Sequence, residues 1–379
     1  MKPIYLDNSA TTQVCPPAAQ KALSLMTEIY GNPSSLHGMG FAAEQEISLA
    51  RRRVAEMLGA KPEEMVFTSG GTEANNLAIF GAVQARRRQG DTIVTTAIEH
   101  PSVLGCMAQL EKQGLRVVYL APDGLGRISA EQVMQAVDSR TILVSLMAVN
   151  NETGAVLPVE AAAKAVARAK APALVHVDAV QAFGKMPLRP QKARIDLLTM
   201  SGHKIHAPKG VGALYIRSGV RILPQVFGGG QEKGLRPGTE AVPLIGALGE
   251  AIAQLPDLAR QWQIQTGLTE ECRRLLAGID GVQFHSPPDA SPYVLNFSTG
   301  SVRSETMLHF LSERGIFVSS GSACAKARAS HVLSAMKLSP ERLHTAIRVS
   351  FSRYTVQEEI ETFVQAVAEG VRTLAKATR

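Results

Sequence analysis

Residues that mark several protein classes are scarce in this sequence of 379 residues. Its four cysteines, Cys15, Cys106, Cys272 and Cys324, are widely separated and form no CxxC pair. This spacing speaks against a structural zinc site and against a disulfide framework. No apolar run reaches the roughly 18 residues that a membrane-spanning helix needs, so we expect no membrane partner.

The N-terminal residues 1–7 lack the apolar segment of a signal peptide. We therefore expect a cytoplasmic protein. In that reducing compartment the cysteines stay free thiols, and one of them could act as a nucleophile.

Basic residues outnumber acidic ones, and the formal net charge is +7. Such a balance suits either a solvated basic surface or an RNA or acidic protein partner. The arginine triplets 51–53 and 86–88 fall in patterns that place apolar residues at helical spacing. This placement favours solvated helix faces, and we expect no direct nucleic-acid binding.

Apolar residues make up 45% of the chain, which is enough for a large core, and the length suits two domains. Short apolar runs alternate with helical patterns up to residue 216. The expected strands are 64–68, 92–97, 115–120, 141–147, 174–178, 195–200 and 212–216, and the helices among them are 72–88, 101–113 and 159–170. This alternation predicts an α/β fold with a mainly parallel central sheet covered on both faces.

The pattern changes past residue 255. The expected elements there are helices at 258–278, 303–314, 331–336 and 356–374 and strands at 281–284, 292–297, 316–318 and 346–351. They predict a smaller C-terminal α+β domain. Residues 222–243 are rich in glycine and proline and are expected to form an extended loop.

Three segments carry residues suited to chemistry. In 68–75 (TSGGTEAN) a strand ends at two glycines and a helix begins at Thr72, an arrangement that can bind an anion or can be an ordinary capped turn. Asp178 ends a strand, where it can hold a protonated pyridine nitrogen or can cap a turn. Lys204 follows a strand and can form a Schiff base, although most lysines are solvated. The three in this order fit a pyridoxal-phosphate enzyme.

Further motifs stand in a fixed order along the chain. They are 5–12 (YLDNSATT), 30–35 (YGNPSS) with His37, 99–101 (EHP), 150–154 (NNETG), 228–232 (GGGQE), 319–324 (SSGSAC) and 347–351 (IRVSF). With these motifs the chain resembles the cysteine desulfurases of the NifS/IscS group, class-V aminotransferase-like enzymes of pyridoxal-phosphate fold type I. The resemblance covers nearly the whole chain. It implies a homodimer, a large cofactor-binding domain at 13–255, and a small domain of 1–12 and 256–379 that carries the cysteine loop 319–330.

The resemblance also implies site residues. Lys204 is the Schiff-base lysine for pyridoxal 5'-phosphate, and His100 stacks on its ring and moves protons. The other implied cofactor contacts are Gly71, Thr72, Asn151, Asp178, Gln181, Ser201, His203 and, from the second subunit, Thr239. The implied substrate contacts are Asn32, Asn151 and Arg348, of which Arg348 clamps the substrate carboxylate.

Cys324 is the implied sulfur acceptor, and its surroundings in the sequence support that role. Residues 319–330 are mainly small, and Lys326 and Arg328 can lower the pKa of the thiol. The alternative role, a small buried apolar residue, suits Cys106 and Cys272 better because both lie in helical patterns. No resident metal is implied, and Cys324 is a candidate transient ligand of an iron–sulfur cluster.

The implied reaction converts L-cysteine to L-alanine and leaves a persulfide on Cys324. Acceptor proteins then take the sulfur for iron–sulfur cluster assembly or for tRNA or cofactor thiolation. A selenocysteine or C–S lyase, or an aminotransferase-like relative, is an alternative on the same fold, and Cys324 speaks against the plain aminotransferase. A basic RNA-associated protein without catalysis is a further alternative, against which Lys204, Asp178 and His100 speak.

Overall fold

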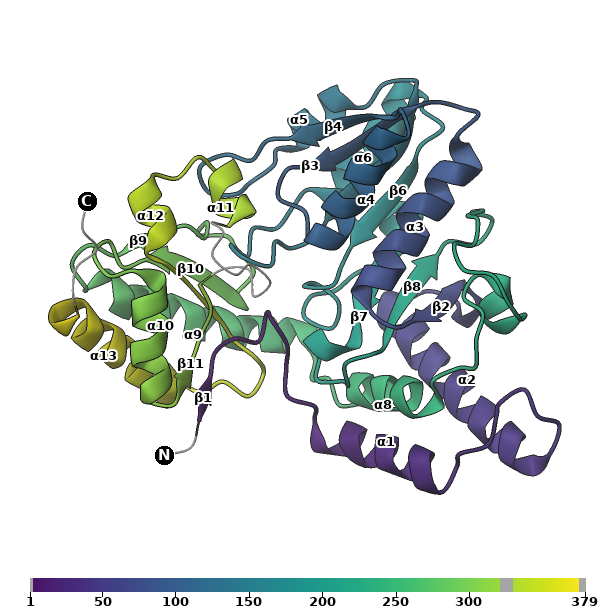
Figure 1. The fold of residues 1–379 in the computed structure, drawn as a ribbon, viewed down its shortest axis with the longest axis horizontal. Coiled ribbons are helices and arrows are strands. Elements are labelled where there is room, and N and C mark those ends of the chain that lie inside the picture. Colours follow the sequence, from purple (N-terminus) through teal and green to yellow (C-terminus); the bar gives the residue numbers. More distant parts are fainter. Residues whose placement is uncertain (1–2, 321–329, 375–379) are drawn as a thin grey trace.

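The computed structural model describes residues 3–320 and 330–374. Its largest sheet has seven strands in the order β2-β8-β7-β6-β5-β3-β4 (Figure 1). The strands are β2 (Met65–Thr68), β3 (Thr92–Thr96), β4 (Arg116–Leu120), β5 (Thr141–Met147), β6 (Leu174–Asp178), β7 (Leu197–Ser201) and β8 (Gly212–Ile216). From β7 to β4 all neighbours are parallel, whereas β8 is antiparallel to both β7 and β2. The predicted mainly parallel sheet is therefore confirmed.

Helices cover both faces of this sheet. One buried cluster joins the sheet to α3 (Gly71–Arg86) and α4 (Pro101–Lys112). The other cluster joins it to α1 (Pro16–Thr27), α2 (Gly38–Leu58), α5 (Ala130–Ala136), α6 (Val159–Ala169) and α8 (Val242–Ala253). Because strands covered on both sides bury every side chain, β5 and β6 read as continuous apolar runs with buried polar residues only where they hydrogen-bond.

The expected extended loop at 222–243 is interrupted by two elements. A short 3-10 turn, η3 (Gln231–Gly234), lies within it, and α8 begins at Val242. In η3, Glu232 is buried at a φ of +46° and makes a two-pronged ion pair with Arg51, at 2.7 and 2.9 Å. Phe67 N–H also donates to Glu232, at 3.0 Å. The prediction of a loop is confirmed apart from the start of α8 and this turn, which a buried ion pair with α2 holds in place.

The C-terminal part has its own sheet, in the order β12-β10-β9 with antiparallel neighbours. Its strands and helices are β9 (Gln283–Phe284), β10 (Val294–Ser298), β12 (Ala346–Ser350), α9 (Leu258–Ala277), α10 (Ser304–Glu313), α11 (His331–Ala335), α12 (Pro340–His344) and α13 (Gln357–Thr373). Side chains from α9, α10 and α13 pack against this sheet in a third buried cluster. The described residues also form α7 (Pro190–Ala193), η1 (Pro62–Glu64) and η2 (Gly202–Lys204).

The N-terminal segment connects the two parts. β1 (Ile4–Tyr5) runs parallel to β11 (Ile316–Phe317), and Leu6 belongs to the buried cluster of the C-terminal part. The chain then crosses to the large sheet, where Thr12 N–H donates to the carbonyl of His203 at 2.9 Å. Figure 1 shows this purple segment passing between the two halves of the molecule. Among the described residues, no helix has the length and apolar character required to cross a bilayer.

Candidate active site

A cavity of about 330 Å³ opens at the carboxyl ends of β5, β6 and β7. Ligands of open α/β sheets bind at this edge. The cavity gathers ten of the residues that the sequence predicts, namely Gly71, Thr72, His100, Asn151, Asp178, Gln181, Ser201, His203, Lys204 and Arg348. The motifs come from distant parts of the chain, so their meeting in one cavity is the central finding of the structure.

Asp178 ends β6 and is buried at the inner end of the cavity. Asn75 Nδ2 donates to its Oδ2 at 2.8 Å, and Val180 N–H donates to its Oδ1 at 3.0 Å. Both carboxylate oxygens therefore accept hydrogen bonds from groups whose positions are fixed by α3 and by the turn after β6. The carboxylate is held in place to meet a cationic or N–H group in the cavity.

Lys204 ends the 3-10 turn that follows β7. Its Nζ donates to the backbone carbonyls of Ser9 and Ala10, at 2.5 and 2.7 Å. Gln181 Nε2 donates to the same Ser9 carbonyl at 3.0 Å. The N-terminal segment thus holds both side chains at the cavity wall.

Lys185 stands directly behind Gln181 and was not identified from the sequence. Its Nζ donates to Gln181 Oε1 at 2.9 Å, and burial, with Lys204 and Arg348 nearby, lowers the pKa of Lys185 to about 7. Because Gln181 Oε1 accepts from Lys185, its amide nitrogen is turned toward Ser9 and the cavity. The four-residue spacing between the two was the one signal in the sequence.

The start of α3 forms the second end of the cavity. Gly70 has a φ of +155°, and a Cβ on Gly71 would lie 2.8 Å from Val180 Cγ2, so the backbone approaches closely where a side chain would not fit. Burial, with Lys204 first among the nearby cations, lowers the pKa of His203 to about 4. A hollow of about 470 Å³ adjoins this end and extends to Lys209. Backbone N–H groups at a helix start, beside hydroxyls and a lysine, suit a phosphate.

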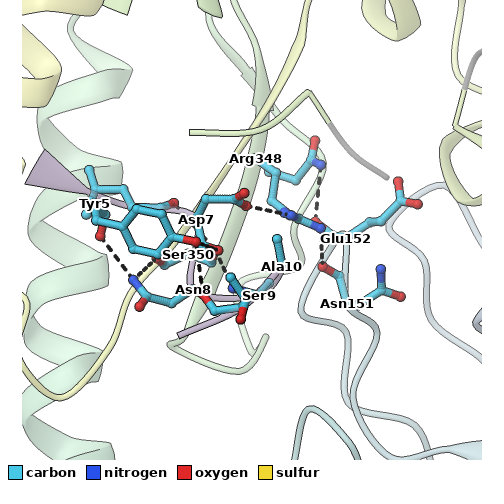
Figure 2. A network of polar contacts seen from close by, with 12 residues as sticks. Tyr5, Asp7, Asn8, Ser9, Ala10, Asn151, Glu152, Arg348 and Ser350 are labelled. Carbon is cyan, nitrogen blue, oxygen red and sulfur yellow. Dashed lines mark hydrogen bonds and ion pairs between the residues drawn. The ribbon is translucent and has the colours of Figure 1, made fainter. Parts of the chain in front are cut away.

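Arg348 lies on β12 at the other side of the cavity, and its side chain is buried (Figure 2). Its Nη2 pairs with Asp7 Oδ1 at 2.7 Å, and its Nη1 donates to the carbonyl of Asn151 at 3.1 Å. Among the described residues, neither Arg348 Nε nor Asn151 Oδ1 has a hydrogen-bond partner, although both atoms are buried. The unsatisfied Nε–H of the Arg348 guanidinium provides a donor for a carboxylate, whereas Asn151 Oδ1 can accept a hydrogen bond from a ligand.

His100 is the N-cap of α4, and its Nδ1 accepts from Ser102 N–H at 3.2 Å. Burial lowers the pKa of His100; among its charged neighbours Asp178 raises it, while Lys204 and His331 lower it. The helix start thus fixes the ring that faces Asp178 and Lys204 across the cavity.

The predicted nucleophile, Cys324, lies outside the described residues. The described ranges end at residue 320 and resume at residue 330. On the two sides of this gap, Ser319 N–H donates to the carbonyl of Arg348 at 3.1 Å, and Ser330 Oγ donates to Glu152. Arg348 and Glu152 both line the cavity, so the chain reaches the gap from the cavity wall and returns to it there.

The other three cysteines are buried, as expected for Cys106 and Cys272. Burial raises the pKa of both of those thiols to about 12. Cys15, whose role the sequence left open, is the N-cap residue of α1, which begins at Pro16. None of the three lines the cavity, so they are poor candidates for a thiolate nucleophile.

Two predicted site residues, Asn32 and Thr239, do not line this cavity. Both border a separate hollow of about 350 Å³ between the end of α1 and the start of α8. Within one chain the structure therefore separates them from Lys204 and Asp178. Among the described residues, no group of three or more His, Cys, Asp or Glu side chains could hold a metal ion.

Known proteins are similar to this chain over almost its whole length. Residues 4–363 match the family model described as aminotransferase class-V. Cysteine desulfurase 2 of Trichormus variabilis is 44% identical over 382 residues, covering 99% of this chain and 94% of that protein. A solved NifS-like protein has a TM-score of 0.92 at 37% identity, covering 98% of this chain and 100% of that one. A structure of SspA in complex with cysteine has a TM-score of 0.82 at 35% identity, covering 93% and 99%. The chain therefore belongs to the class-V aminotransferase family, and its α/β fold is that of the NifS-like proteins.

Proposed function

We propose that this protein is a pyridoxal-phosphate-dependent cysteine desulfurase that converts L-cysteine to L-alanine and carries the sulfur as a persulfide on Cys324. The observation that carries the proposal is the single cavity that joins Lys204, Asp178, His100 and Arg348. The relatives named cysteine desulfurase, and the SspA structure with cysteine, support the choice of substrate.

The cavity fits pyridoxal 5'-phosphate on four observations. The helix start at Gly71 and Thr72 can receive the phosphate. Asp178, whose carboxylate accepts a hydrogen bond from Val180 N–H, can pair with the pyridine nitrogen. Lys204 Nζ lies at the cavity wall, where it donates to the Ser9 and Ala10 carbonyls and can reach an aldehyde. The unsatisfied Asn151 Oδ1 needs a polar partner.

Each of three side chains of the cavity has its own role toward the substrate. When bound, pyridoxal phosphate withdraws electrons from the substrate Cα. Arg348 binds the substrate carboxylate and so orients the Cα–H bond. Lys204 takes up the Cα proton, because its Nζ is the amine at the cavity wall. His100 faces the reacting atoms from the opposite wall.

Sulfur transfer falls to Cys324. Its thiolate forms an S–S bond with the substrate sulfur while the substrate Cβ–S bond breaks. The electron pair of that bond stays on the carbon fragment, which gains a proton and is released as alanine. The products are alanine and a Cys324 persulfide, so no external oxidant or reductant is needed.

We further propose that the active form is a homodimer in which Asn32 and Thr239 serve the partner's cavity. Both residues lie away from the cavity of their own chain. Apolar side chains that border this hollow are exposed, including Tyr30 at 67% and Met26 at 55%. Apolar exposure of this kind marks an association surface.

Other expectations rest on the sequence and the relatives. Sulfur acceptors that assemble iron–sulfur clusters or thiolate tRNA or cofactors fit the names of the IscS relatives, of which Cysteine desulfurase IscS of Serratia proteamaculans is one. The division into 13–255 and 1–12 with 256–379 is supported by Leu6, which packs in the C-terminal cluster. A cytoplasmic location and transient iron–sulfur ligation by Cys324 stay predictions.

Incubation of the holoenzyme with L-cysteine tests the proposal. We expect one alanine per sulfur transferred and a persulfide on Cys324, detected by mass spectrometry. Lys204→Ala should abolish the visible absorbance of the bound cofactor, and the exposed Lys164→Ala should keep it. Cys324→Ser should keep the absorbance but form no persulfide, whereas Cys272→Ala should form it in full.

Full persulfide yield from Cys324→Ser would contradict the role of that residue. Pyruvate, sulfide and ammonia as products would instead identify a C–S lyase, and a strong preference for selenocysteine would identify a selenocysteine lyase.

Mixing Lys204→Ala subunits with Thr239→Val subunits tests the dimer. Each hybrid should regain one intact cavity, and no recovery on mixing would contradict the shared site.

A further inference from the structure

A continuous chain of hydrogen bonds joins Asp178 to His100 along one side of the cavity. Asn75 Nδ2 donates to Asp178 Oδ2 at 2.8 Å and to Ser102 Oγ at 2.9 Å. Ser102 Oγ lies 2.8 Å from His100 Nδ1. The four residues come from the end of β6, from α3 and from the start of α4, so three separate elements fix the geometry.

The direction of these hydrogen bonds follows from the carboxylate. Because Asp178 accepts, Asn75 must turn its amide nitrogen toward it, and the second amide hydrogen then points to Ser102 Oγ. Asn75 is completely buried, which prevents water from replacing either partner. The Ser102 hydroxyl accepts from Asn75, and its own single hydrogen remains to be donated to His100 Nδ1.

A second and independent donor reaches the same ring nitrogen. Ser102 N–H donates to His100 Nδ1 at 3.2 Å, as the N-cap bond of α4. A backbone N–H can only donate, so Nδ1 must be an acceptor. A neutral imidazole that accepts at Nδ1 carries its proton on Nε2. Nε2 hydrogen-bonds no other group in residues 3–320 and 330–374.

The charges around the ring favour the neutral form. Besides burial, Lys204 from the turn after β7 and His331 from α11 lower the pKa of His100, whereas Asp178 raises it. The neighbouring Glu99 adds no opposing charge, because burial raises the pKa of this carboxyl group to about 8. His331 Nε2 contacts the Glu99 carbonyl at 2.9 Å, which keeps α11 against this segment.

We propose that Asn75 and Ser102 are positioning residues that hold His100 as a neutral imidazole with its proton on Nε2. In this state His100 donates a hydrogen bond into the cavity and cannot accept a proton there. The inference rests on the proposed function and divides its proton chemistry: Lys204 is the base, and His100 is a fixed donor. The atom that meets Nε2 must then be an acceptor, such as a thiolate or an oxygen anion.

Nitrogen NMR of the holoenzyme labelled only at histidine tests this state directly. The chain has nine histidines, and the signal lost in His100→Gln identifies His100. At neutral pH we expect an unprotonated Nδ1 and a protonated Nε2. Ser102→Ala removes the hydroxyl donor and should move the pKa of His100 toward its ordinary value of roughly 6.5. Ser102→Thr keeps a hydroxyl and should restore the wild-type spectrum.

Alanine formation gives a second readout. His100→Gln retains an N–H donor and should lose about tenfold less in kcat than His100→Leu, the factor of one hydrogen bond. A protonated Nδ1 in the wild type, or a spectrum of Ser102→Ala identical to the wild type, would overturn the proposal. An acidic limb of the pH profile that vanishes in His100→Gln would identify His100 as a base and would overturn it as well. The NMR result needs no turnover, so it stands apart from any failure to detect alanine or persulfide.

Discussion

Replacing Arg348 by lysine separates carboxylate binding from the positive charge itself. Arg348 already donates hydrogen bonds to Asp7 and to the Asn151 carbonyl. Its buried Nε has no partner among the described residues. A guanidinium can keep those contacts and still present Nε to a substrate carboxylate. A lysine ammonium is a single point with no planar pair of donors, so it must give up at least one of these hydrogen bonds.

The expected loss follows from that one hydrogen bond. Hydrogen bonds to charged groups are worth about 1.5–3 kcal/mol, which corresponds to an affinity that is weaker by about 10- to 150-fold. Binding of L-alanine to the holoenzyme, followed by the visible absorbance of the cofactor, measures this term without turnover. KM for L-cysteine should rise by a similar factor, and kcat should change less because the reacting atoms are untouched.

A matched control is available on the surface. Arg314 pairs with Glu369, and their side chains are 35% and 45% exposed. Arg314→Lys should leave both alanine affinity and KM unchanged. If Arg348→Lys is folded and binds alanine within about twofold of the wild type, then no substrate carboxylate meets Arg348, and the orientation argued for the substrate is wrong.

Three further outcomes follow from buried groups. Glu232→Gln should lower the free energy of unfolding by about 1.5–3 kcal/mol, because Arg51 loses its two-pronged partner; a urea titration showing no loss would contradict this. Cys106 and Cys272, whose pKa is raised to about 12 by burial, should resist iodoacetamide in the folded protein and react after denaturation. Burial lowers the pKa of His176 to about 3, so the folded state excludes a proton that the unfolded state binds below roughly pH 6.5. The free energy of unfolding should decrease as the pH drops below that value, by up to about 1.4 kcal/mol per pH unit for this group. The slope of this free energy against pH should be smaller in His176→Gln.

The parallel sheet was predictable because the burial of each strand is visible in the local sequence pattern. The expected strands at 141–147, 174–178 and 212–216 coincide with β5, β6 and β8, since strands covered on both faces carry unbroken apolar runs. Helix ends were less exact. The expected helix at 72–88 is α3 (Gly71–Arg86), because a glycine at a helix start leaves no side-chain signal.

Contacts between distant residues could not be predicted in the same way. Asn75 and Asp178 are 103 positions apart, and Arg51 and Glu232 are 181 positions apart. Nothing in the local pattern around Glu232 distinguishes a buried ion-pair partner from a solvated carboxylate in a glycine-rich loop. Lys185 was missed for the same reason, because its burial depends on how Tyr293 and the N-terminal segment pack around it. The motif residues were found, whereas the side chains that hold them were not.

The N-terminal segment has a consequence for how the protein is made on the ribosome. Asn8 Nδ2 bonds the carbonyl of Ser350, which is 342 positions further along the chain. At about 5–20 residues per second, translation takes roughly 20–70 seconds between the two. For most of that interval β1 has no partner strand, because β11 (Ile316–Phe317) is itself synthesised late. The carbonyls that hold Lys204 follow this unpaired strand directly. The site of Lys204 is therefore completed only when the last strand has been synthesised, long after the large sheet has emerged.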